Sequence, residues 1–263
     1  MANQSRTFVL NPDNGYWGLS TEGQELKLAE DLAMRKKPLK CYNNVQVIAL
    51  NTTETCNQRC IYCSTVKHRS AKMMPLEIAT KTIDQLQDLG GVSQVIFHGS
   101  EPLLNMKIIR GTVKYANDSY KRTGKEVSFS IQSNLTALTQ DKIDFIRENK
   151  IGVSTSLDGR EHEHNLNRPY KNGGPTYTDV RKSIDKVLEF QKGICAVCVV
   201  TKNNVSHLSD IAINFEKIGI TEVQFLPAVN CSSNKEFMPS NRDLSNSYID
   251  LFEQTFRKYR EGS

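Results

Sequence analysis

From residue 45 to near the end of the chain, short β-branched segments alternate with longer amphipathic segments. Such alternation is typical of right-handed βαβ units that build a parallel sheet. The expected strands are 45–50, 94–97, 127–132, 152–157, 194–200 and 222–226. The expected helices are 75–89, 105–122, 139–149, 175–191, 207–218 and 243–260. Six strands are too few for the closed eight-stranded barrel. We therefore expect an α/β fold, a six-stranded (βα)6 partial TIM barrel.

The N-terminal part of the chain has a different pattern. Two short β-prone runs flank residues 11–15 (NPDNG), which is typical of a hairpin turn. An amphipathic pattern over 21–37 predicts a helix that ends before a proline. We therefore expect two domains, a hairpin and helix appendage in residues 1–40 and the partial barrel in residues 41–263.

Charge and hydropathy exclude several classes of function. The net charge of +5 comes from scattered Lys and Arg, and the densest groups, such as residues 35–37, are too short for a nucleic-acid-binding track. No apolar run approaches membrane-spanning length, and residues 1–6 are polar and do not resemble a signal peptide. We expect a cytoplasmic protein that binds neither nucleic acid nor a membrane.

Three of the seven cysteines, Cys56, Cys60 and Cys63, lie directly after the first expected strand. In parallel α/β folds the loops at this end of the strands form the active-site mouth. Thiolate sulfur suits both iron–sulfur clusters and zinc. A closed zinc site needs four ligands, and Cys41 or His68 could supply the fourth. Three ligands on a four-iron cluster would leave one iron open, and the spacing after a strand favours this interpretation.

The spacing C-x3-C-x2-C, with Tyr62 just before the last cysteine, resembles the signature of the radical S-adenosylmethionine (SAM) superfamily. The resemblance implies a [4Fe–4S] cluster on Cys56, Cys60 and Cys63, whose open iron binds the amino and carboxylate groups of SAM. It also implies that one electron from the reduced cluster splits the sulfonium bond. The products would be methionine and a 5′-deoxyadenosyl radical that abstracts a substrate hydrogen.

A second segment continues the resemblance, which extends over residues 45–260. The segment after the second expected strand resembles the G-G-E-P segment of the family. It consists of His98, Gly99, Ser100 and Glu101, followed by a proline. By that match the backbone of this turn and the Glu101 carboxylate would hold the amino group of the cofactor. His98 is placed to reach the cofactor or the substrate. Ser100 replaces the second glycine, and a position with positive φ would tolerate Ser poorly.

Three later segments also resemble family motifs, namely SIQSN over 130–134, SLDG over 156–159 and HNLNR over 164–168. By that match Gln132 would lie at the cofactor, and Ser156 and Arg168 would contact its ribose or carboxylate. A guanidinium suits a carboxylate because its planar fork donates two parallel hydrogen bonds. Leu226, near the end of the sixth expected strand, would pack on the adenine together with Tyr62.

The segment HNLNR resembles an H-D-x-x-R motif, with Asn165 where Asp is usual. Together with SLDG it resembles the branch that contains anaerobic sulfatase-maturing enzymes and SPASM-type peptide maturases. Members of that branch usually carry a cysteine-rich SPASM extension. In this sequence no auxiliary-cluster motif follows the helical pattern at 243–260, which is compatible with a short natural member or a truncated one. The resemblance implies a peptide or protein substrate and a ferredoxin or flavodoxin electron donor. A small-molecule substrate and a non-catalytic zinc or iron–sulfur module are the alternatives.

The remaining cysteines and histidines give weaker signals. Cys195 and Cys198 form a second C-x-x-C, but residues three apart on a strand point to opposite faces and cannot easily share a metal. We interpret them as strand packing. We expect His164 at the surface, where it is the best candidate for ordering the loop that carries Arg168.

Overall fold

The computed structural model describes residues 6–10, 17–21, 27, 47–63, 71–89, 93–228 and 235–260. The chain divides into two compact units, residues 1–43 and 44–263. In the first unit β1 (Arg6–Leu10) pairs antiparallel with β2 (Trp17–Thr21), so the predicted hairpin is present. Most of the helix predicted over 21–37 lies outside the described residues. The assignment of these units as separate domains stays a prediction.

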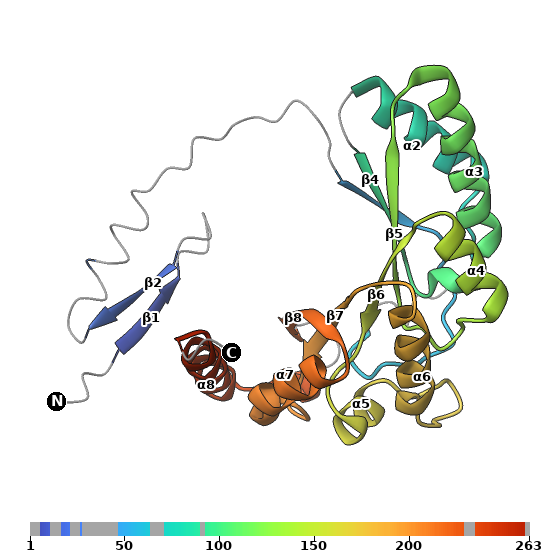
Figure 1. Ribbon diagram of the computed structural model, residues 1–263. Coiled ribbons are helices and arrows are strands. Elements are labelled where there is room, and N and C mark those ends of the chain that lie inside the picture. The colour runs from blue at the N-terminus through green and yellow to red at the C-terminus, as the bar shows by residue number, and fades with distance from the viewer. Residues whose placement is uncertain are drawn as a thin grey trace. The chain divides into compact units, whose positions relative to one another are not determined.

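Six strands of the second unit form one parallel sheet in sequence order. They are β3 (Val47–Asn51), β4 (Ser93–His98), β5 (Val127–Ser133), β6 (Gly152–Ser156), β7 (Ile194–Val200) and β8 (Ile220–Pro227). Figure 1 shows the strands as an open arc with the helices along its outer side. The six-stranded partial barrel predicted from the alternation is confirmed.

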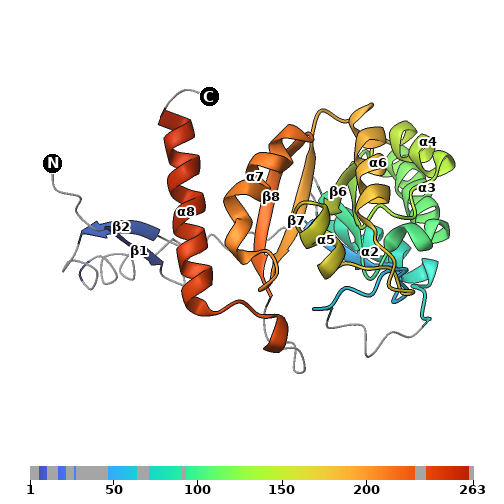
Figure 2. The ribbon, with the colours of Figure 1, turned by 90° about the horizontal axis from the view of Figure 1, so that it is seen from below.

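The helices follow the strands in the expected order. They are α2 (Leu76–Leu89), α3 (Met106–Thr123), α4 (Gln140–Glu148), α5 (Glu161–Asn167), α6 (Tyr177–Leu188), α7 (Leu208–Lys217) and α8 (Asn241–Arg260), with short 3-10 turns η2 (Pro102–Leu104), η3 (Val205–His207) and η4 (Lys235–Phe237). The short helix α5 was not predicted. Helix α8 lies beside α7 (Figure 2). Among the described residues, no helix combines the length and the apolar character that crossing a membrane requires.

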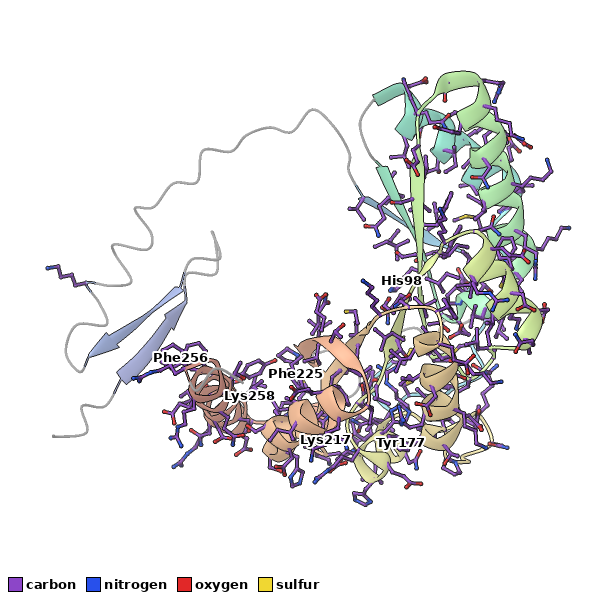
Figure 3. The ribbon with its side chains drawn as sticks, in the orientation of Figure 1. His98, Tyr177, Lys217, Phe225, Phe256 and Lys258 are labelled. Atoms are coloured by element: carbon purple, nitrogen blue, oxygen red, sulfur yellow. The ribbon has the colours of Figure 1, made fainter. Side chains whose placement is uncertain are left out.

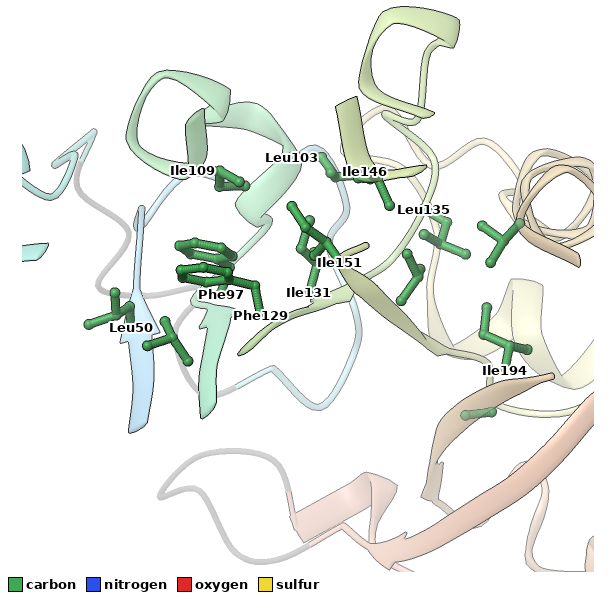
Figure 4. Packing of buried hydrophobic residues seen from close by; sticks show 14 of the residues in the cluster. Leu50, Phe97, Leu103, Ile109, Phe129, Ile131, Leu135, Ile146, Ile151 and Ile194 are labelled. Atoms are coloured by element: carbon green, nitrogen blue, oxygen red, sulfur yellow. The ribbon is translucent and has the colours of Figure 1, made fainter. Parts of the chain in front are cut away.

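The core lies between the outer face of the sheet and the helices. Alternate strand residues point to opposite faces, and those on the outer face, such as Phe97 and Phe129, are buried. These two rings stack with their centroids 5.5 Å apart (Figure 4). Helix residues such as Ile109 and Ile146 complete the same cluster. The other strand residues, which alternate with these, point to the inner face of the arc.

Strand β7 illustrates this alternation. Cys198 is buried on the helix side, whereas Cys195 lies half-buried on the opposite, inner face. Burial raises the pKa of both thiols. The two cysteines therefore point away from each other, as predicted for residues three apart on one strand.

Candidate active site

The three motif cysteines lie in one loop at the carboxyl end of β3. Cys56 and Cys60 are buried, with exposed fractions of 5% and 8%, and Cys63 is half-buried. Burial raises the pKa of the Cys60 thiol to about 12, the positive charge of Arg168 opposes this, and the charges of Asp158, Cys56 and Cys63 add to it. Cys60 therefore lies within electrostatic range of both other thiols.

This donor set fits a four-iron cluster. Within the described residues, no three Cys, His, Asp or Glu side chains lie close enough together to hold one metal ion. A four-iron cluster does not require that, because each thiolate binds a different iron of the cluster. Two of the three sulfurs also have donors nearby, since Gln58 N–H lies 3.4 Å from Cys56 Sγ and Arg168 Nη1 lies 4.0 Å from Cys60 Sγ.

The backbone at the end of α5 and just after it holds the cysteine loop in place. Arg59 N–H donates to the Pro169 carbonyl (2.8 Å), and Ile61 N–H donates to the Asn167 carbonyl (3.0 Å). These bonds form a short antiparallel pairing between parts of the chain that are more than 100 residues apart. The pairing brings the side chain of Arg168 against the loop.

Asp158, in the turn after β6, connects two side chains of this region. The Tyr62 hydroxyl donates to Asp158 Oδ2 (2.6 Å), and Arg168 Nε lies 2.9 Å from Asp158 Oδ1. The guanidinium carbon of Arg168 lies 5.4 Å from the centre of the Tyr62 ring. Burial lowers the pKa of Arg168, but Asp158, followed by Tyr62 and Cys60, more than offsets this, and the pKa lies well above its usual value. The guanidinium is therefore a permanent buried charge beside Cys60.

A second chain of hydrogen bonds fixes the backbone around Arg168. Asp158 N–H donates to His164 Nδ1 (3.2 Å), and the Thr176 hydroxyl donates to the Arg168 carbonyl (2.6 Å). His164 Nε2, 3.1 Å from Thr176 Oγ1, is then the donor to that hydroxyl. Burial lowers the pKa of His164 to about 3, so the ring is neutral.

The expectation that His164 lies at the surface was wrong. Its side chain is fully buried, because α5 packs against α6 and the ring accepts a hydrogen bond from Asp158 N–H in the turn after β6. The contact through Thr176 to the Arg168 carbonyl fits the expected role of His164 in ordering that loop.

The turn after β4 explains how Ser100 is tolerated. Gly99 has φ of +117°, and a Cβ at this position would lie 2.7 Å from the Thr53 carbonyl oxygen. The left-handed conformation therefore falls on Gly99, and Ser100 does not share it. Ser100 N–H instead donates to the same Thr53 carbonyl (3.0 Å). The side chain of His98 is exposed and lies on the inner side of the arc (Figure 3).

Glu101 is fully buried, and its carboxylate accepts three hydrogen bonds. Oε1 accepts from Leu103 N–H (3.0 Å) and from the Ser133 hydroxyl (2.7 Å), and Oε2 accepts from Asn134 N–H (2.8 Å). Burial raises the pKa of Glu101, and these hydrogen bonds oppose the shift. The carboxylate thus caps η2 and joins this turn to the end of β5. Its predicted contact with the amino group of the cofactor stays a prediction.

The other predicted site residues lie on the inner face of the sheet. Gln132 Nε2 donates to the Ser156 hydroxyl (3.2 Å), and the Ser154 hydroxyl donates to Gln132 Oε1 (2.6 Å). Leu226 on β8 is 48% exposed. The structure therefore brings Gln132 and Ser156 into contact. The roles of these residues in binding the cofactor remain predictions.

Two residues of this region were not singled out from the sequence as site residues. Asn134 Nδ2 lies 3.7 Å from Cys56 Sγ and donates to Asn57 Oδ1 (3.0 Å). Asp158 holds Tyr62 as described above. Both residues belong to segments that resemble family motifs, so the motifs marked the correct regions, but nothing in one sequence indicates which neighbours these side chains contact.

Comparison with known proteins identifies the family. Residues 50–212 match the family model of the Radical SAM superfamily. The chain belongs to this superfamily. The radical SAM superfamily is a family of enzymes that use a [4Fe–4S] cluster and SAM, and the cysteine loop described above lies inside the matched region.

The radical SAM chain has several curated relatives. It is 32% identical over 178 residues to an uncharacterized protein of Methanocaldococcus jannaschii. The aligned region covers 68% of this chain and 61% of the relative. It is 27% identical over 183 residues to a cysteine-type anaerobic sulfatase-maturating enzyme of Clostridium perfringens. Here the aligned region covers 67% of this chain and 49% of that enzyme. The chain thus spans about half to three fifths of the length of these relatives.

Solved structures share the fold. The solved structure of native anSMEcpe with bound AdoMet and Cp18Cys peptide superposes with a TM-score of 0.74 at 22% identity, covering 83% of this chain and 61% of that one. Streptococcus suis SuiB bound to precursor peptide SuiA superposes with a TM-score of 0.60 at 15% identity, covering 88% and 52%. At these identities the likeness establishes the partial barrel fold.

Proposed function

We propose that this radical SAM chain binds a [4Fe–4S] cluster through Cys56, Cys60 and Cys63 and abstracts a hydrogen atom from a residue of a peptide or protein. The observation that supports this most strongly is the loop itself, in which the three cysteines follow the first strand of the partial barrel and two of their sulfurs have hydrogen-bond donors nearby. When bound, the reduced cluster supplies the electron that cleaves SAM to methionine and a 5′-deoxyadenosyl radical.

The residues around the loop are proposed to bind SAM. The backbone of Gly99 and Ser100 and the carboxylate of Glu101 would receive its amino group. Arg168 would bind its carboxylate. His98, exposed on the inner face, would reach the cofactor or the substrate.

Side chains of the inner face are proposed to bind the nucleoside part of SAM. Gln132 and Ser156, which already hydrogen-bond to each other, offer polar groups to the ribose. Tyr62 and the exposed Leu226 offer apolar surface to the adenine. With SAM bound in this way, the chain would orient the 5′ carbon of its ribose toward the open inner face.

A peptide or protein substrate is supported by the relatives. One is a sulfatase-maturating enzyme, and the solved neighbours include two complexes with peptides. We propose maturation by crosslinking or oxidation of a residue, in the cytoplasm and with a ferredoxin or flavodoxin as the electron donor. The chain spans only part of the length of these relatives. The proposal therefore names a class of substrate and not the particular substrate of any one relative.

The test is anaerobic reconstitution with iron and sulfide, followed by reduction with dithionite in the presence of SAM. We expect about four irons per chain and release of 5′-deoxyadenosine. The Cys60→Ala variant should release none, whereas Cys195→Ala, on the inner face of β7, should behave like the wild type. A loaded cluster without 5′-deoxyadenosine, or one zinc per chain without iron, would refute the proposal.

The substrate class is tested with deuterium. Candidate peptides that carry deuterated Cys or Ser side chains are incubated with the reconstituted chain, and deuterium in 5′-deoxyadenosine is measured by mass spectrometry. Transfer from a peptide supports the proposed substrate. If deuterium enters 5′-deoxyadenosine only from a deuterated small molecule and never from a peptide, a small-molecule substrate is favoured.

A further inference from the structure

The carboxylate of Asp158 is fixed from three directions. Its Oδ1 accepts a hydrogen bond from Val199 N–H on β7 (2.9 Å) and lies 2.9 Å from Arg168 Nε. Its Oδ2 accepts from the Tyr62 hydroxyl (2.6 Å). The backbone carbonyl of Asp158 accepts from Asn204 Nδ2 (2.8 Å). With an exposed fraction of 0%, this carboxylate cannot turn toward another partner without breaking several of these bonds.

Both side chains that Asp158 holds belong to the immediate surroundings of the cysteines. Tyr62 lies between Cys60 and Cys63 in the sequence, so its hydroxyl anchors the second half of the loop. Arg168 Nη1 lies 4.0 Å from Cys60 Sγ. One buried carboxylate therefore controls the position of the loop and also the charge beside one of its sulfurs.

The charges in this region are coupled. Arg168 is 7% exposed, so its attraction to nearby negative charge is screened much less than at the surface. Asp158 neutralises most of this positive charge at a distance of 2.9 Å. Removing one partner of a buried pair leaves the other uncompensated. The net charge beside Cys60 thus depends on Asp158 staying in place next to Arg168.

We propose that Asp158 is a positioning residue of the cluster, which anchors the cysteine loop through Tyr62 and balances the charge of Arg168 beside Cys60. The proposal rests on the proposed assignment of the cluster to the three cysteines. It gives Asp158 a role toward the metal centre without contact to it. An ion pair that stabilises the fold at a site away from the cysteines, such as Glu163 with Arg160, would leave the reduction potential of the cluster unchanged.

The sign of that shift follows from electrostatics. Reduction adds one negative charge to the cluster, so uncompensated positive charge nearby stabilises the reduced form. Asp158→Asn leaves Arg168 uncompensated and should raise the midpoint potential. We expect about a tenfold change in the ratio of reduced to oxidised cluster at a fixed potential, or about 59 mV. Arg168→Gln should shift the potential in the opposite direction.

The experiment is a redox titration of the anaerobically reconstituted chain, followed by EPR. The matched control is Glu163→Gln, which makes the same chemical change at a buried carboxylate of α5 that pairs with Arg160 instead. Opposite shifts for Asp158→Asn and Arg168→Gln, with none for Glu163→Gln, support the proposal. Unshifted potentials at full iron content overturn it. A wild-type chain that forms no cluster would instead refute the proposed function.

A second variant keeps the proposal testable if Asp158→Asn does not fold. Tyr62→Phe removes only the hydroxyl that donates to Asp158, and Tyr115→Phe removes a comparable hydrogen bond to Asp84 between α2 and α3. Iron release from the loaded protein to a chelator should be several-fold faster in Tyr62→Phe and unchanged in Tyr115→Phe. Equal rates in Tyr62→Phe and the wild type would overturn the anchoring role.

Discussion

His164 Nε2 lies 3.1 Å from Thr176 Oγ1, at a point where neither side chain is exposed to solvent. The hydroxyl of Thr176 donates to the Arg168 carbonyl, so the imidazole must supply the proton of the first bond. On its other side the ring accepts the N–H of Asp158. The pair therefore joins the turn after β6 to the loop of Arg168, and it does so only while His164 is neutral.

This requirement predicts a pH dependence of stability. Burial, followed by the charge of Arg168, lowers the pKa of His164 from 6.5 to about 3. In the unfolded chain the same ring takes up a proton near pH 6.5. The stabilisation is therefore complete above that pH and is lost as the pH falls toward 3. Between pH 7.5 and 5.5 this residue should lower the free energy of unfolding by about 1.4 kcal/mol.

The measurement is urea unfolding of the wild type and of His164→Gln at both pH values. A glutamine side chain can accept from Asp158 N–H and donate to Thr176 but does not titrate. The difference in unfolding free energy between wild type and variant should shrink at pH 5.5. A difference that stays constant with pH would contradict a neutral buried His164.

A second prediction concerns Gly99. Gly99→Ala would place a Cβ 2.7 Å from the Thr53 carbonyl oxygen at φ of +117°, so we expect a loss of about 3 kcal/mol or more in stability. Gly124→Ala is the control, because Gly124 also has positive φ (+67°) but has no atom within 4 Å of the added Cβ. Thermal unfolding should show a clearly larger drop in Tm for Gly99→Ala, and equal drops would contradict the steric argument.

A third prediction concerns Glu101. In Glu101→Gln, an amide NH2 replaces one carboxylate oxygen, so at least one of the donors at Leu103, Ser133 and Asn134 loses its acceptor. A buried donor left without a partner costs roughly 1–3 kcal/mol. The urea midpoint should fall at an unchanged m-value.

Glu77→Gln serves as the control for Glu101, because Glu77 forms an exposed ion pair with Lys81 on α2. Exposed pairs of this kind contribute little to stability, so the midpoint of Glu77→Gln should stay at the wild-type value. The same loss in both variants would show that the hydrogen bonds of Glu101 do not stabilise the turn.

The strands and the longer helices could be predicted because their signal is local. The bounds of β7, residues 194–200, were predicted without error, and the bounds of the other strands differ by at most two residues at either end. The seven-residue helix α5 was missed, since it completes only two turns and shows too little periodicity. This miss also explains why His164 was expected at the surface.

The candidate site could be predicted only as a set of segments. The motifs marked the loop of Cys56 to Cys63, the turn at Gly99 and the ends of the third and fourth strands. The contacts that organise them join residues far apart in the sequence, such as Tyr62 and Asp158, which are 96 positions apart. Glu101 shows the same limit, since a buried carboxylate must find internal donors and the sequence does not reveal which ones.

The central claim is that three cysteines leave one iron of the cluster free to bind SAM. The most direct test is the EPR spectrum of the dithionite-reduced, reconstituted chain, recorded before and after addition of SAM. We predict a reduced-cluster signal whose shape changes when SAM is added, and which is retained in Cys195→Ala and lost in Cys60→Ala. A fully loaded cluster whose signal is identical with and without SAM would contradict the account.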